Sequence, residues 1–216
     1  MNHLDFPIVD AHIHQWDPYH TPHAAALAVK LFGKRPKLLD KVVRLVKSKE
    51  LIDTLGLTQH ITAPYLPEDY KKDLGHYVVD QVVHVEASWH HQKGKGVVEE
   101  TTFIESLPFQ QHDLKLGALV ATADPRDSNF KKILKMHNQA SPHFRGIRKM
   151  ASFHEDKGIY AWAMNRIYIA IRSFSKALSY WRNIISVLMH GRIQHNFQMS
   201  LHLPNSFLKP QLFLII

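Results

Sequence analysis

Four short apolar runs, each ending in polar residues, recur along the first 153 residues, and helical patterns separate them. The runs occupy residues 6–14, 77–89, 114–125 and 144–153. Strands of a buried parallel sheet are typically near-continuous runs of Val, Ile and Leu, and two parallel neighbours need a crossover that is usually a helix. The alternation therefore predicts βαβ units and a parallel sheet in an α/β fold.

Helical spacing of apolar residues fills the intervals between these runs. Pro36 marks a helix start and Gly56 a stop, Pro67 occupies a first-turn position, and Ser128 is a candidate cap. We expect helices over residues 24–32, 37–55, 63–74, 96–107 and 128–140.

Length and composition narrow the class of protein. A chain of 216 residues predicts one domain, and it contains no cysteine, so a metal must be held by His, carboxylate or water. Neither an apolar stretch of membrane-spanning length nor a secretory signal is evident, so we expect a cytoplasmic location with no membrane partner.

Acidic residues stop abruptly in the sequence. Residues 1–156 contain 20 Lys or Arg and 19 Asp or Glu, whereas residues 157–216 contain seven Lys or Arg and no acidic residue. Soluble surfaces normally mix both signs of charge. The change predicts two segments of different origin, residues 1–162 and 163–216.

Two histidines end the first apolar run. In a strand, residues i and i+2 face one side, so His12 and His14 project together, with Asp10 behind them. Such a pair can supply two ligands to one divalent ion, with Zn and Mn as candidates. The alternative is a pair of core histidines bonded to backbone, and for an isolated motif of this kind the alternative is favoured.

The second run repeats the arrangement. His84 and Glu86 share one face, which we expect to look into a barrel or crevice, while Val83, Val85 and Ala87 pack on helices. A glutamate inside a sheet needs a partner, so Glu86 is either a metal ligand or paired with Arg148 or a histidine.

Arginine and tryptophan side chains complete the candidate site. Arg148 in the fourth run suits capture of a substrate carboxylate, or an ion pair with Glu86. We expect His84 to contact substrate with Arg148, and Trp16 to wall a pocket unless it only packs. Other residues near strand ends are assigned no role in the site. Asp124, Arg126 and Asp127 are assigned to a turn and helix cap, Trp89 to packing, and His90 and His91 to a loop. His154 is a weaker candidate for the site.

Several of these motifs, in this order, resemble one family. DAHIHQWDP, YLPEDYKKDL, VVHVEASW, GALVATADPRD and FRGIRK, within residues 5–162, are similar to the amidohydrolase-2 branch of the amidohydrolase superfamily. The resemblance implies a TIM-type (β/α)8 barrel that hydrolyses lactones or related carbonyl compounds, with or without a divalent metal. It implies that His12 and His14 hold the metal with Glu86, and that Glu86 and Arg148 are catalytic.

The chain departs from that family in its last quarter. The family's general-base aspartate on the last strand has no counterpart, since no acidic residue follows Asp156, and His190 with Gly191 only superficially resembles a later family motif. We expect an incomplete barrel of about four βα units, its second half replaced after a reading-frame shift near Met164. Open sheet edges predict aggregation or a homo-oligomer.

Two functions therefore stay open for this chain. One is a hydrolase of impaired activity that takes a small lactone or carboxylate-bearing substrate, and the other is an inactive remnant that binds metal weakly. A basic binder of nucleic acid or membrane surface, suggested by the last 60 residues, is disfavoured because their positive charges are spaced singly.

Overall fold

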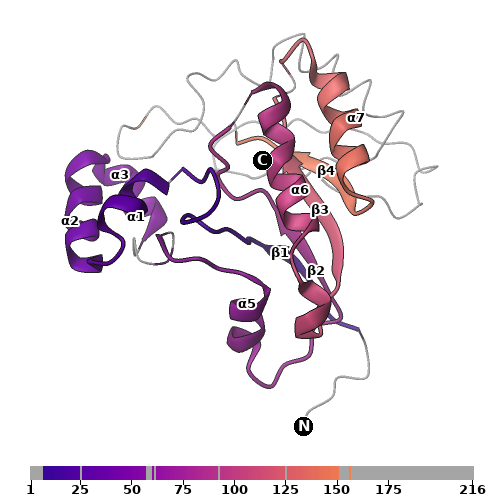
Figure 1. Cartoon of the computed structure of the whole chain (residues 1–216), viewed down its shortest axis with the longest axis horizontal. Coiled ribbons are helices and arrows are strands. Elements are labelled where there is room, and N and C mark those ends of the chain that lie inside the picture. Colours follow the sequence, from indigo (N-terminus) through magenta and orange to yellow (C-terminus); the bar gives the residue numbers. More distant parts are fainter. Residues whose placement is uncertain are drawn as a thin grey trace.

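Four parallel strands form the centre of the molecule (Figure 1). The computed structural model describes residues 7–24, 26–56, 60, 62–91, 93–124, 126–150 and 156. The strands pair in chain order, each with the next, as the sequence predicted. They are β1 (Val9–Ile13), β2 (Gln81–Val85), β3 (Leu116–Thr122) and β4 (Phe144–Arg148).

Helices occupy every connection between these strands. The connection from β1 to β2 carries α1 (Ala26–Phe32), α2 (Pro36–Val46), α3 (Lys49–Leu55) and α5 (Pro67–Leu74). The later connections carry η1 (Gly94–Val98), α6 (Glu99–Glu105), η2 (Phe109–His112) and α7 (Phe130–Ala140). None of the described helices is long and apolar enough to cross a membrane.

The main core lies between one face of the sheet and the helices. It joins Val82, Leu119 and Ile147 of the strands to Ile104 of α6 and Ile133 of α7. Burying each such side chain contributes roughly 1.5–3 kcal/mol to folding. A separate small cluster covers the other face of the sheet, with members Val83, Val85 and Val120 and, partly buried, Ala118.

The orientation of β2 is opposite to the sequence-based expectation. Val83 and Val85 face away from the helices, whereas His84 pairs in register with Leu119, a member of the helix-facing core. A strand buried on both faces is apolar on both, so alternation along β2 does not decide which side meets the helices.

A register shift interrupts the pairing of β1 with β2 between Asp10 and Ile13. Asp10 pairs with Val82 and Ile13 pairs with His84, with an irregularity between the two pairs. The Tyr70 hydroxyl of α5 donates to Asp10 Oδ2 at 2.8 Å. Its other oxygen, Oδ1, accepts a hydrogen bond from His12 N at 3.1 Å, so the Asp10 carboxylate connects the His12 backbone to α5.

Helix starts and stops agree with the sequence at the prolines and at Gly56, and differ elsewhere. Residues 37–55 form two helices, because the Ser48 hydroxyl accepts a hydrogen bond from Leu51 N (3.3 Å) and begins α3. Ser128 does not cap α7, because the N-cap residue is Asn129. The Asp127 carboxylate, two residues before this N-cap, accepts from Asn129 N (2.7 Å).

Candidate functional site

Side chains from three strands meet at the carboxyl edge of the sheet. His12 and His14 lie at the end of β1, Glu86 follows β2, and Arg148 is the last residue of β4. Arg148 Nη2 donates to the Glu86 carbonyl and His14 Nδ1 to the neighbouring Val85 carbonyl, so the guanidinium and His14 contact adjacent residues. The positive charge of Arg148 also contributes to lowering the pKa of both histidines. Open parallel sheets and barrels carry ligand sites at this edge.

The two histidines face each other. His12 Nε2 and His14 Nε2 are 3.2 Å apart, and the ring planes are inclined by 76°. His14 Nδ1 lies 2.8 Å from the Val85 carbonyl, to which only a protonated Nδ1 can donate. His14 Nε2 therefore carries the lone pair and points at His12.

Desolvation favours the neutral form of both imidazoles, of the partly buried His14 more than of the exposed His12. It lowers the pKa of His14 to about 4, although the hydrogen bond to Val85 acts in the opposite direction. The pKa of His12 is also lowered, by burial first and then by Arg148. Neutral imidazoles are the form that binds a metal ion.

The pair fits two ligands of one ion. Two nitrogens bound to one Zn²⁺ at 2.0–2.1 Å with tetrahedral angles lie roughly 3.3 Å apart, close to the observed separation. Hydrogen bonding of the other ring nitrogen, as His14 makes to Val85, is usual for a ligating histidine. Within the described part of the chain, no third His, Asp or Glu joins them in a group able to hold a metal.

Glu86 is paired with Arg148. Arg148 Nε donates to Glu86 Oε1 at 2.7 Å and Nη2 donates to the Glu86 carbonyl at 2.6 Å. Their side chains are only 7% and 11% exposed, and Ser88 N donates to the second carboxylate oxygen at 3.3 Å. Of the two roles left open for Glu86, the geometry shows the ion pair with Arg148. Metal ligation by Glu86 stays a prediction.

His84 is a buried structural residue in this arrangement. It has no exposed surface, and Gln15 N lies 3.3 Å from its Nδ1, which must accept that hydrogen bond. The proton is therefore on Nε2, 3.6 Å from a Glu100 carboxylate oxygen. Burial lowers the pKa of His84 to about 3. The contact of His84 with substrate stays a prediction.

Glu100 is a site neighbour that the sequence analysis missed. Ala87 N donates to its carboxylate, yet burial raises the pKa of Glu100 to about 7. The signal was its position on α6, three residues after Val97 and four before Ile104, both members of the helix-facing core.

Trp16 anchors the segment that follows the histidines. Its indole N–H donates to the Ala63 carbonyl at 2.8 Å, and its backbone pairs with Tyr65. Its ring lies 5.6 Å from the Tyr65 ring and 6.4 Å from the His23 ring. A substrate contact of Trp16 stays a prediction.

The residues assigned to turns and packing behave as expected. Arg126 folds back on Asp124, with Nη2 2.7 Å from Oδ2, and Trp89 is buried 5.8 Å from the Phe103 ring. His154, His190 and Gly191 lie outside the described residues.

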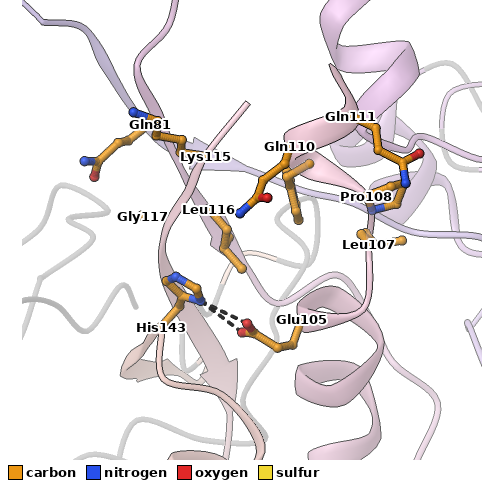
Figure 2. A pocket seen from close by; sticks show the side chains of 11 residues that line it. Gln81, Glu105, Leu107, Pro108, Gln110, Gln111, Lys115, Leu116, Gly117 and His143 are labelled. Atoms are coloured by element: carbon orange, nitrogen blue, oxygen red, sulfur yellow. Dashed lines mark hydrogen bonds and ion pairs between the residues drawn. The ribbon is translucent and has the colours of Figure 1, made fainter. Parts of the chain in front are cut away.

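A hollow of about 640 Å³ lies elsewhere, at the amino ends of β2 and β3 (Figure 2). There His143 pairs with Glu105 at 3.1 Å, beside Gln81, Lys115 and Gly117. The opposite end of the strands carries the histidine pair, so this hollow is separate from the candidate site.

These features define an α/β protein with a polar site at the carboxyl edge of a four-stranded parallel sheet. No protein family, curated protein or solved structure matches the chain.

Proposed function

We propose that residues 1–162 are the amino-terminal half of an amidohydrolase-type (β/α)8 barrel, and that the chain descends from hydrolases of lactones or related carbonyl compounds. The order β1-β2-β3-β4, wholly parallel and with helices in every connection, is that of half such a barrel. We place the protein in the cytoplasm.

The observation that carries this proposal is the 3.2 Å approach of the His12 and His14 Nε2 atoms beside Arg148. The two histidines would hold a divalent ion, Zn or Mn, which polarises the substrate carbonyl when bound. Arg148 Nη1 has no hydrogen-bond partner among the described residues and is suited to a substrate carboxylate. Glu86 would fix the guanidinium in place and so act as a positioning residue.

An inactive remnant is the second candidate, and one observation favours it. Hydrolysis needs a group that accepts the proton of the attacking water. Both Glu86 oxygens are already hydrogen-bonded, and no acidic residue follows Asp156. On this alternative the chain binds metal through the histidine pair and turns over no substrate.

Turnover by the purified full chain separates the two candidates. We would assay a panel of lactones with and without Zn²⁺ or Mn²⁺, for the chain itself and for His12→Ala/His14→Ala. The matched control is His76→Ala, which removes an exposed histidine. Hydrolysis that requires His12 and His14 but not His76 supports the hydrolase, whereas no hydrolysis together with metal binding that the double variant loses supports the remnant.

A further inference from the structure

Charge is segregated between the first three helices and the rest of the described fold. Residues 26–56, here called the helical lobe, contain eight Lys or Arg and three Asp or Glu, a net charge of +5, and all eight basic residues are exposed. The other described residues contain 12 Lys or Arg and 14 Asp or Glu, a net charge of −2. In Figure 1 the lobe is set apart from α6 and α7.

The same lobe exposes large apolar side chains. On α1, Leu27 is 73% and Leu31 65% exposed; on α2, Leu45 is 86% and Val46 72% exposed. A single exposed leucine is ordinary on a protein surface. Here large apolar side chains are exposed on both α1 and α2, two helices that contact each other, and groups of exposed apolar side chains are typical of interaction sites.

Basic residues border these leucines on the same helix faces. Leu27 and Leu31 are four residues apart, and Lys30 lies three residues after Leu27. On α2, Lys41 lies three residues after Leu38 and four before Leu45. Residues at these spacings are neighbours on a helix surface, so each helix presents leucine flanked by lysine.

Charge decides which occupant this surface fits. Residues 157–216 carry seven basic and no acidic residues, and the lobe of a second copy carries the same +5, so both are repelled. Charge therefore favours an anionic occupant that also accepts exposed leucines.

We propose that the helical lobe binds the surface of an anionic lipid bilayer. Leucine side chains enter the boundary between headgroups and acyl chains, while lysines and arginines are attracted to anionic headgroups. Among the described residues, the excess of positive charge lies in the lobe, so the lobe is the part of the described fold that an anionic surface attracts. This binding mode needs no membrane-spanning segment, and it uses the basic residues of the lobe, whereas the sequence-based argument against a membrane-surface binder concerned the singly spaced charges of residues 157–216.

Vesicle co-sedimentation of the full chain tests the proposal. We expect binding to vesicles of phosphatidylcholine with 30% phosphatidylserine and none to phosphatidylcholine alone. Lys30→Gln/Lys41→Gln should weaken the partition coefficient by about tenfold or more, since each basic residue near such a surface contributes about fivefold. Leu27→Gln/Leu45→Gln should also weaken it by about tenfold.

Matched controls lie outside the lobe. Lys132→Gln/Lys135→Gln removes two exposed lysines from α7, and Val78→Gln removes an exposed apolar side chain before β2. Both should leave vesicle binding unchanged. Circular dichroism of every variant verifies that the helices are retained.

Three outcomes would overturn the proposal. The first is equal binding to neutral and anionic vesicles. The second is anionic binding that the leucine variant retains while the lysine variant or 0.5 M salt abolishes it, which identifies a general polyanion surface. The third is concentration-dependent self-association that the leucine variant abolishes, without vesicle binding, which identifies an interface between copies.

Discussion

Arg148 on β4 reaches past β3 to Glu86, which follows β2, and binds both its carboxylate and its carbonyl. The pair therefore ties together two strands that are not neighbours, at the edge where the histidines lie. Both side chains are almost fully buried, so each needs the other to compensate its charge.

Removing one partner of this pair should destabilise the fold. Arg148→Met leaves the Glu86 carboxylate buried without its cation, and we expect the free energy of unfolding to fall by about 3 kcal/mol. Urea unfolding followed by circular dichroism measures this change. The double variant Glu86→Gln/Arg148→Met should recover part of the loss, because neither charge then remains unpaired.

The surface pair Asp124 and Arg126 supplies the matched control. Their side chains are 24% and 42% exposed, so Arg126→Gln should change the free energy of unfolding by less than about 1 kcal/mol. Equal effects of Arg148→Met and Arg126→Gln would contradict the buried position of Arg148.

Glu100 should make the protein less stable at alkaline pH. Its pKa is about 7 in the folded state, above the ordinary 4.5, so its protonated form stabilises the fold fully below pH 4.5 and that stabilisation is lost as the pH rises through 7. In Glu100→Gln this loss should vanish, which raises stability at pH 8 relative to pH 5 by about 3 kcal/mol compared with the unmodified chain. Urea midpoints at the two pH values measure it, and an unchanged pH dependence in the variant would refute the assignment.

Buried histidines should make the protein less stable at acid pH, in contrast to Glu100, which does so at alkaline pH. The pKa values of His14 and His137 are lowered to about 4 and that of His84 to about 3, so unfolded chains take up protons first. Their contribution to stability is complete above pH 6.5 and is lost as the pH falls toward 4.

His137 offers the cleanest test of this acid effect. Its ring nitrogens lie 2.8 Å from the Thr101 hydroxyl and 3.1 Å from the Thr122 carbonyl. His137→Gln keeps a donor and an acceptor but does not titrate, so the loss of stability between pH 7 and 5 should be smaller than in the unmodified chain. His76→Gln, at an exposed position, should leave that loss unchanged, and equal slopes for both variants would count against a neutral buried His137.

The strands could be predicted because β-branched runs separated by helical patterns leave few alternatives, and all four strands lie within the predicted runs. The face of the sheet to which each side chain points could not be predicted. Val82 and Val83 are equally apolar, so the pattern of β2 is compatible with either face toward the helices. The register shift that turns Asp10 toward Tyr70 depends on pairing with β2, which no local pattern encodes.

The candidate site could be predicted only where it depends on local spacing, and not where it depends on how the strands pack. The approach of His12 and His14 follows from spacing within one strand, whereas the choice of Arg148 as the partner of Glu86 depends on three strands packing side by side. Glu100 was missed because a glutamate in the first turn of a helix usually lies in solvent, and its place between the core residues Val97 and Ile104 was not weighed against that tendency.

Calorimetric titration of the full chain with Zn²⁺ at pH 7.5 tests most directly whether His12 and His14 act together as one ligand pair. We expect one class of site per chain that is lost in His12→Ala and equally lost in His14→Ala, with no further loss in the double variant, while His76→Ala binds as the unmodified chain does. Zinc binding of unchanged stoichiometry and affinity in the double variant would contradict a metal site at the carboxyl edge of β1.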